Sequence, residues 1–227
     1  MAVELISVHL PKAAGTSFLH SLFGAYGQDA VSLDYQDDPA DPCSDYSLDP
    51  EGCRRKARDA VHTIAVKVIH GHFHPSKYDF ADDVRRITFL RHPVDTLISI
   101  YYYWKTRGDG HCLFNYARER QLTLRQTARL PVVRYLLSRT YFGGFDMDRF
   151  DFIGFIDTYT NDMRRLAQVL SVPVAETKEN ANVYPGYRDE VADIRANRSL
   201  VSDLEDSLLE DIRFYDAVRN RRDARPV

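Results

Sequence analysis

The feature that most constrains the fold is a short apolar segment that runs directly into a loop of small residues and then a helix. Residues 3–10 are mostly β-branched or aliphatic and stop at Pro11, which is typical of a buried strand. Residues 17–26 carry apolar side chains at helical spacing, and Gly27 offers a C-terminal stop. A strand, a loop and a helix in this order predict the first part of an α/β sheet.

The same alternation continues along the chain, which predicts a parallel sheet covered by helices on both faces. A single domain over residues 1–227 is expected, because no repeat or linker divides the chain. Further strands are expected at 63–69, 86–90 and 152–156, and helices at 94–105, 113–140 (two, broken near Pro131), 162–170 and 200–218, with an acidic loop at 34–53 and a frayed tail from 219.

Composition and charge limit the partners and the compartment. Hydrophobic residues make up 44% of the chain, and the net charge of −3 argues against a general nucleic-acid binder, so an anion site must be local. The acidic stretch at 34–53 lacks EF-hand spacing, which favours a solvated loop over a calcium site. Three cysteines without a CxxC pair favour a reduced compartment, with a Cys43–Cys53 bridge as the alternative. Without a signal peptide or an apolar run of about 20 residues, we expect a cytoplasmic protein with no membrane span.

The loop that follows the first strand, from Pro11 to Ser17, has the residue types of an anion site. Backbone N–H groups at a helix start favour negative charge, and Gly15 lets the backbone approach a ligand closely. Lys12 adds a positive charge, while Thr16 and Ser17 add hydroxyl donors. The Walker A motif places its lysine after the glycine, whereas here the lysine comes first. The alternative interpretation is a capped helix with a solvated lysine.

A second candidate anion site follows the strand at 86–90. Arg91 is expected at the carboxyl end of that strand, where open α/β sheets bind their ligands. Ser99 lies two turns into the next helix, and the two side chains could grip one phosphate together. A surface ion pair and a serine on the wet face of the helix are the alternative.

Three histidines alternate after the strand at 63–69, and a continuing strand would place His70, His72 and His74 on one face. One interpretation is a general base for a hydroxyl group, because imidazole titrates near neutral pH. A zinc site built on a His-x-His pair and simple packing at a strand end are the others. With two anion sites present, we rank the base first, packing second and zinc third.

Together these motifs resemble those of sulfotransferases that use 3′-phosphoadenosine 5′-phosphosulfate (PAPS). Residues 11–17 resemble the 5′-phosphosulfate loop of that family, with Ala13 and Ala14 where a threonine and a glycine or alanine are often found. The stretch from Arg91 to Ser99 resembles the 3′-phosphate motif. The histidine pair of His70 and His72 resembles the catalytic strand end of uronyl 2-O-sulfotransferases and related carbohydrate sulfotransferases. Residues 106–145 match no motif of the family.

The resemblance implies the sulfotransferase fold, a P-loop-like parallel sheet flanked by helices. It implies transfer of a sulfuryl group from PAPS to a hydroxyl group of a carbohydrate or small-molecule acceptor, with no metal. His72 would be the base, His70 would orient it or share its role, and Lys12 would stabilise the leaving phosphate. The implied donor contacts are Lys12, Ala14, Gly15, Thr16, Ser17, Arg91 and Ser99, with Asn182, Tyr184 and Arg188 as donor or acceptor contacts in the polar segment 176–190.

Two other functions remain open from the sequence. One is a nucleoside-triphosphate kinase or hydrolase with an unusual loop, which predicts dependence on Mg²⁺. The other is a non-catalytic module that binds a nucleotide or a glycan. The sequence defines neither the acceptor nor the oligomeric state. The arginines of the helical region that matches no motif form either a solvated face or a site for an anionic acceptor; they are Arg118, Arg120, Arg125, Arg129 and Arg134.

Overall fold

The computed structural model describes residues 3–61, 65–81, 83–106, 112–177 and 184–224. These residues belong to two units, Met1–Arg91 with Thr140–Glu179 and His92–Arg139 with Asn180–Val227. The expectation of one domain over the whole chain stays a prediction. None of the helices in the described part of the chain combines the length and the apolar character needed to cross a membrane.

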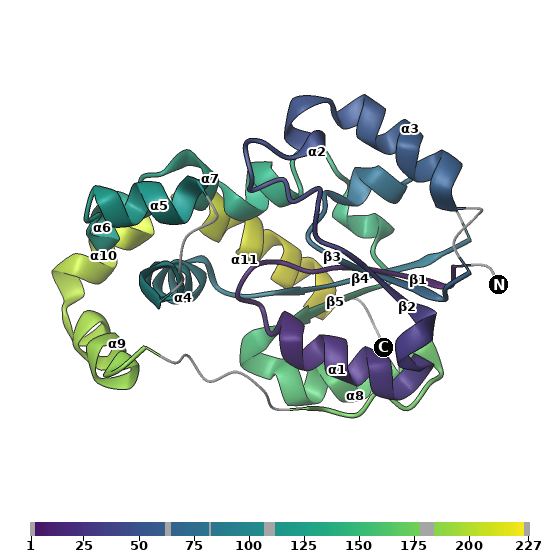
Figure 1. The fold of residues 1–227 in the computed structure, drawn as a ribbon. Helices are drawn as coiled ribbons and strands as arrows, with labels where there is room; N and C mark the ends of the chain where they lie inside the picture. The colour runs from purple at the N-terminus through teal and green to yellow at the C-terminus, as the bar shows by residue number, and fades with distance from the viewer. Residues whose placement is uncertain (1–2, 62–64, 82, 107–111, 178–183, 225–227) are drawn as a thin grey trace. The chain divides into compact units, whose positions relative to one another are not determined.

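A five-stranded parallel sheet forms the centre of the first unit (Figure 1). β1 lies in the middle, where its Val8 pairs with Gly71 on one side and Thr88 on the other. The prediction of an α/β fold with a parallel sheet flanked by helices is confirmed. In spatial order the strands are β2 (Val31–Asp34), β3 (Val68–Gly71), β1 (Leu5–Val8), β4 (Arg85–Leu90) and β5 (Phe152–Phe155).

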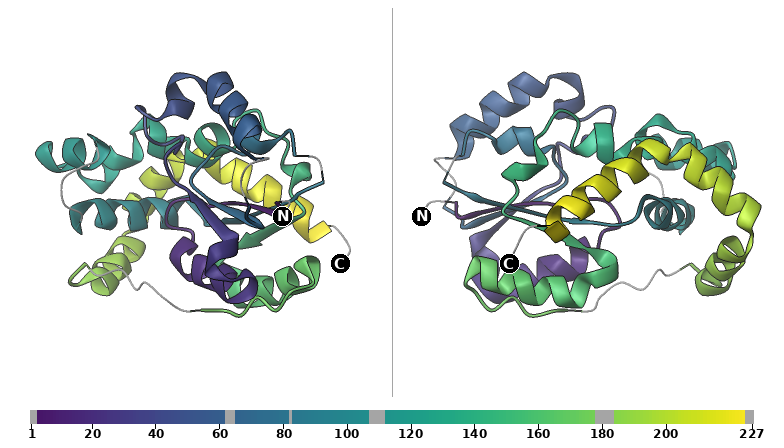
Figure 2. Two further views of the ribbon diagram at one scale, coloured as in Figure 1. Left: turned by 45° about the vertical axis from the view of Figure 1, so that its right-hand side comes forward. Right: turned by 180° about the vertical axis from the view of Figure 1, so that it is seen from behind.

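Helices cover both faces of this sheet. Figures 1 and 2 show α1 (Gly15–Tyr26) and α8 (Tyr159–Leu170) on one face, with α2 (Asp45–Leu48) and α3 (Pro50–Val61) over the other. Phe18 packs against Phe89 at 5.1 Å between ring centroids, within a core that joins α1, α8 and the sheet. Each fully buried apolar side chain of this kind contributes about 1.5–3 kcal/mol. Short 3₁₀ turns lie at Gln28–Ala30, Pro75–Tyr78, Met147–Arg149 and Ile156–Thr158.

The second unit is helical in its described part. Asp211 is buried there and accepts the backbone N–H groups of Leu137 and Ser138, each at 2.8 Å. This carboxylate thereby satisfies the start of a π-helical turn, Leu136–Tyr141, which runs on into the first unit. The helices are α4 (Pro93–Thr106), α5 (Cys112–Glu119), α6 (Leu124–Ala128), α7 (Pro131–Arg134), α9 (Tyr187–Ala196), α10 (Arg198–Ser207) and α11 (Leu209–Ala224).

Two elements of the first unit were not expected from the sequence. α3 lies where we predicted only an acidic loop, and its buried positions are Gly52, Cys53 and Ala57, so it has no large apolar side chains to give a helical pattern. β2 is an edge strand in which Val31 alone is buried, so it presents no apolar run. Cys43 and Cys53 are both free thiols, and the alternative of a bridge between them is therefore wrong.

Helix boundaries in the second unit also differ from the predictions. Residues 113–140 fold into several short helical segments instead of two helices, and Pro131 begins one of them. The last helix, expected at 200–218, is interrupted at Leu208. α11 then continues through part of the predicted frayed tail as far as Ala224.

A buried lysine holds the acidic residues that follow β2. The side chain of Lys77 is 7% exposed, and its Nζ lies 2.5 Å from Oδ2 of Asp34 and also contacts the carboxylate of Asp37. The hydroxyl group of Tyr78 donates to the same Oδ2 of Asp34 at 2.8 Å. The interpretation of this stretch as a solvated acidic loop is therefore wrong at these two aspartates, because their charges are paired inside the protein.

Replacing this lysine tests how much the paired charges contribute. Lys77→Met should lower the free energy of unfolding by about 3–5 kcal/mol, because Asp34 and Asp37 lose the partner of a buried ion pair. Urea denaturation followed by circular dichroism measures the change. Lys56→Met is the matched control, since Lys56 and its partner Asp45 are both largely exposed, and it should change stability little. Equal effects of the two substitutions would contradict the prediction.

Candidate functional site

The loop between β1 and α1 has a strained backbone. Lys12 (φ 63°) and Ala14 (φ 59°) both adopt the left-handed conformation, which costs a residue other than glycine about 1–2 kcal/mol. Among the described residues no side chain caps the start of α1, and its first turn contains no acidic residue. The positive end of the helix therefore favours an anion, which agrees with the strain because strained backbone is commonly found at functional sites.

The loop residues differ in their exposure. Lys12 and Ala14 are half-buried, and Thr16 is exposed. Ser17 lies beneath the loop, and its carbonyl oxygen accepts the hydroxyl group of Thr177 at 2.5 Å. Thr16 and Ser17 were both predicted to contact the sulfuryl donor through their hydroxyl groups. The hydroxyl group of Thr16 is therefore the more accessible of the two.

Arg91 reaches this loop from the end of the neighbouring strand β4. Its Nη1 donates to the carbonyl oxygen of Lys12 at 3.1 Å. We predicted both segments to bind anions. Although they are 79 residues apart in the chain, they thus meet at the carboxyl ends of β1 and β4. The guanidinium group also helps to hold Lys12 in its left-handed conformation.

Four further predicted contacts belong to other parts of the chain. Ser99 is buried in α4, Tyr184 is half-buried shortly before α9, and Arg188 is exposed at the start of α9, all three within the second unit. Their positions relative to the loop stay predictions. Asn182 lies outside the described residues.

A histidine that the sequence analysis did not single out, His9, is central to the end of β1. Its ring stacks on that of His72 at 4.3 Å and on that of His70 at 5.2 Å between centroids. The Tyr35 ring packs edge-on against it at 6.0 Å. A Cβ atom at Gly15 would lie 1.6 Å from Nε2 of His9, so the glycine is required because this ring occupies the space. The one available sequence signal was its position between a strand and a candidate anion loop.

The same loop fixes the protonation of His72. Its Nδ1 lies 2.6 Å from the backbone carbonyl oxygen of His9, and since a carbonyl can only accept, Nδ1 carries the hydrogen. Nε2 of the neutral ring therefore keeps its lone pair. Burial lowers the pKa of His72, while the carboxylate of Asp38 and the hydrogen bond to His9 act in the opposite direction. The neutral ring is then the form that can accept a proton near neutral pH.

His70 is too enclosed to meet a bulky substrate. It is 1% exposed, its Nδ1 lies 2.9 Å from Oγ of Ser7, and its Nε2 has no hydrogen-bond partner among the described residues. Burial lowers its pKa to about 3. A small cavity beneath the loop, lined in part by His70, Ser7 and Gly15, has room for about one water molecule.

His74 matches the packing interpretation. Its Nδ1 accepts the backbone N–H of Ser76, and its Nε2 donates to the carbonyl oxygen of Gly143 at 3.1 Å. Both ring nitrogens are thus used to join the turn after β3 to a distant segment. The rings of His9, His70 and His72 stack face to face, and the described part of the chain contains no group of three His, Cys, Asp or Glu side chains placed to hold a metal ion.

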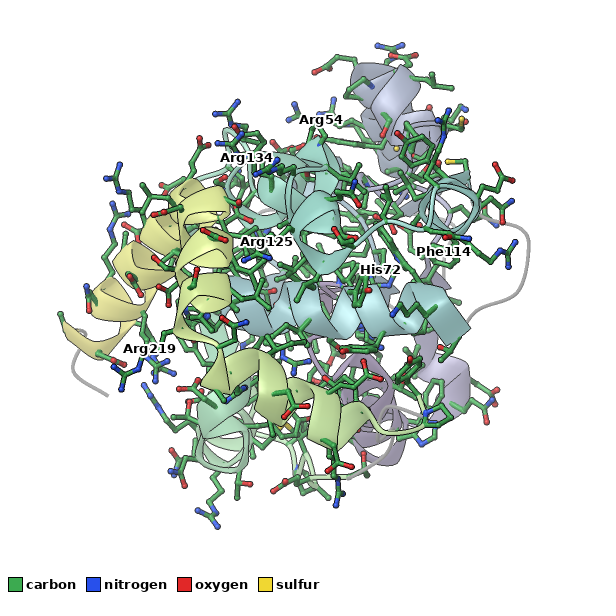
Figure 3. All side chains as sticks on the ribbon, turned by 90° about the vertical axis from the view of Figure 1, so that its left-hand side faces the viewer. Arg54, His72, Phe114, Arg125, Arg134 and Arg219 are labelled. Atoms are coloured by element: carbon green, nitrogen blue, oxygen red, sulfur yellow. The ribbon has the colours of Figure 1, made fainter. Side chains whose placement is uncertain are left out.

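Two arginines of the second unit join its helices. Arg125 donates through Nε to Oδ2 of Asp203 at 2.8 Å, and Arg134 donates through Nε to the carbonyl oxygen of Ser207 at 3.1 Å (Figure 3). These contacts attach α6 and α7 to α10. Arg125 and Arg134 therefore have a structural role. Whether these arginines form a solvated face or a site for an anionic acceptor stays a prediction.

Comparisons with known proteins give distant structural likeness. Neither a known family model nor a curated protein matches the sequence. The structure is similar to a sulfotransferase from Alicyclobacillus acidocaldarius, at 16% identity over 96% of this chain and 99% of that one, with a TM-score of 0.42. It is also similar to mouse sulfotransferase SULT7A1 complexed with PAP, at 10% identity over 85% of this chain and 63% of that one, with a TM-score of 0.39. At such low identity, function has to be argued from the site.

Two glycines of α1 provide a test of the contact between His9 and the loop. Gly15→Ala should lower the free energy of unfolding by about 1–3 kcal/mol, because the new methyl group displaces the His9 ring. Gly24→Ala meets nothing within 4 Å and should raise it by up to about 1 kcal/mol. Urea denaturation of both variants measures the difference. A stabilised Gly15→Ala protein would show that the His9 ring does not occupy this place.

The buried histidines also predict how stability depends on pH. Burial holds the pKa of His70 at about 3 and that of His74 at about 4, against 6.5 for an ordinary histidine. The unfolded chain therefore binds more protons below pH 6.5, and the free energy of unfolding should fall towards pH 4 by about 1.4 kcal/mol per pH unit for each of them. Denaturant melts at several pH values measure this slope. His70→Asn should lower the slope by about 1.4 kcal/mol per pH unit, the contribution of one proton. A stability that is constant between pH 6.5 and 5 would contradict the prediction.

Proposed function

We propose that this protein transfers a sulfuryl group from PAPS to a hydroxyl group of an acceptor. The observation that carries the proposal is that two side chains, from the strands on either side of β1, are attached to the loop after β1. Arg91 donates to the carbonyl oxygen of Lys12, and His72 donates to that of His9. The candidate anion loop and a histidine with a free Nε2 lone pair therefore lie together at the carboxyl ends of the strands, where parallel sheets bind their ligands.

The loop would hold the phosphosulfate end of the donor. The start of α1 and the ammonium group of Lys12 supply positive charge, and the exposed hydroxyl group of Thr16 supplies a donor. The guanidinium group of Arg91 adds charge beside Lys12. Following the resemblance in sequence, Ser99, Asn182 and Arg188 remain candidates for contacts with the rest of the donor.

The reaction would proceed by displacement at sulfur. The acceptor hydroxyl oxygen forms a bond to sulfur as the bond from sulfur to the bridging oxygen of the 5′-phosphate breaks. The hydroxyl proton passes to Nε2 of His72, and the negative charge that grows on the bridging oxygen is met by Lys12 and the helix start. His72 suits the role better than His70, because His72 is half-buried whereas His70 is enclosed. The acceptor would be a carbohydrate or a small hydroxylated molecule.

A comparison of two nucleotides tests the donor. 3′-Phosphoadenosine 5′-phosphate (PAP), the reaction product, should raise the melting temperature because it binds only the folded protein, and Lys12→Met should weaken that effect. Thermal shift with PAP, set against ATP with Mg²⁺, is the measurement. A shift with ATP and Mg²⁺ but none with PAP would overturn the proposal in favour of a kinase or hydrolase.

A substitution at the base separates catalysis from binding. His72→Asn should keep the thermal shift with PAP, while the rate of PAP release from PAPS in the presence of phenolic and sugar acceptors falls by about 10²–10⁴-fold. Binding of PAP without turnover on any acceptor by the unaltered protein would indicate a non-catalytic module. An unchanged rate in His72→Asn would remove this residue from the role of base.

A further inference from the structure

Asp38 lies in the acidic stretch after β2, and the fold gives it a defined place. Its Oδ1 accepts the hydroxyl group of Tyr141 at 2.6 Å and the backbone N–H of Ala40 at 2.8 Å. Tyr141 is fully buried, so its hydroxyl group holds the carboxylate in one orientation. No cation among the described residues pairs with this carboxylate, which can therefore act on a neighbouring group by its charge.

The neighbouring group is His72. The Tyr141 ring, which carries the hydroxyl group bonded to Asp38, also packs edge-on against the His72 ring at 6.4 Å between centroids. The ring of Tyr35, three residues before Asp38, also packs edge-on against the His72 ring, at 4.9 Å between centroids. Tyr141, which is fully buried, thus joins the carboxylate of Asp38 to the ring of His72 on one side of that ring, and a charge in such a partly buried place acts more strongly than one in open water.

The charged and titratable groups around His72 come from several elements. His9, in the loop after β1, lies against its face, and Lys12 acts on His9 from the same loop. His70 lies on β3 itself, and its pKa is lowered by burial first and by His72 second. Tyr35 and Asp38 follow β2, and Tyr141 lies at the end of the π-helical turn Leu136–Tyr141. Asp38 is the one negative charge in this set of described groups.

We propose that Asp38, oriented by Tyr141, is a positioning residue that stabilises the protonated form of His72. This inference rests on the proposed function, in which His72 takes the proton of the acceptor hydroxyl. As that proton arrives at Nε2, the ring gains a positive charge that burial disfavours, and the adjacent His9 and His70 rings carry no charge to compensate it. The fixed carboxylate of Asp38 offsets this cost. It keeps the base strong enough to work near neutral pH.

The buried lysine described above explains why this carboxylate stays in place. Lys77 pairs with Asp34 at the end of β2 and with Asp37, directly before Asp38. The lysine is therefore occupied by two neighbouring acids, and Asp38 keeps its own charge for His72. The three aspartates of this short segment thus have separate roles, two in anchoring the chain and one beside the base.

Substitution of Asp38 tests the proposal by nuclear magnetic resonance and by kinetics. Asp38→Asn keeps an oxygen that can accept from Tyr141 and Ala40, so the fold should be retained while the charge is lost. The pKa of His72, followed through its ring Cε1–H signal and assigned with His72→Asn, should fall. The acid limb of the kcat/KM profile should move to lower pH, and kcat at neutral pH should drop by about tenfold. Asp38→Glu restores the charge and should recover part of both.

Two controls separate charge from structure. Asp29→Asn removes the same charge from an exposed turn and should leave the pKa of His72 and the rate unchanged. Tyr141→Phe keeps the Asp38 charge but removes the hydroxyl group that orients it, so the pKa of His72 should fall less than in Asp38→Asn, whereas a purely structural pair would make the two variants behave alike. An unchanged His72 pKa in Asp38→Asn would overturn the inference. The histidine titration needs no turnover, so it stands or falls independently of whether the protein transfers sulfuryl groups.

Discussion

The loop after β1 holds Lys12 and Ala14 in the left-handed conformation, which residues with a Cβ atom avoid. Side chains from the ends of the two adjacent strands stabilise this loop. β4 contributes Arg91, which donates to the carbonyl oxygen of Lys12. The turn after β3 contributes His72, which donates to the carbonyl oxygen of His9. Because β1 lies between β3 and β4, its loop can be reached from both sides at once. The central position of β1 thus allows contacts from both sides to stabilise the strained loop.

Residues whose role follows from local pattern could be predicted from the sequence. The strand, the loop and the first helix follow from apolar spacing and from Gly15, and Arg91 was placed at a strand end by the same reasoning. The general position of His72 followed from its alternation with His70. These predictions succeed because each depends on a few neighbouring residues, whose chemistry is the same in any fold.

Residues whose role comes from distant contacts could not be predicted in this way. His9 acts through its ring and its backbone carbonyl, and neither leaves a signal in sequence spacing. Asp38 lies among several other aspartates, and only the approach of Tyr141, 103 residues later, distinguishes it. The alternation of histidines was misleading for His74, because the strand ends at Gly71 and the chain turns before His74 is reached.

The place of β2 in the sheet has a consequence for thermal behaviour. Like β5 at the opposite side, β2 is an edge strand of the described sheet, hydrogen-bonded to β3 alone, and edge strands separate from a sheet more readily than central ones. The segment that carries Asp38 continues directly from it. Local fraying on warming would therefore withdraw the carboxylate from the imidazole while β1, β3 and β4 remain paired. Under the proposed function, the basicity of His72 therefore depends on an edge strand, and loss of activity on heating is expected before global melting.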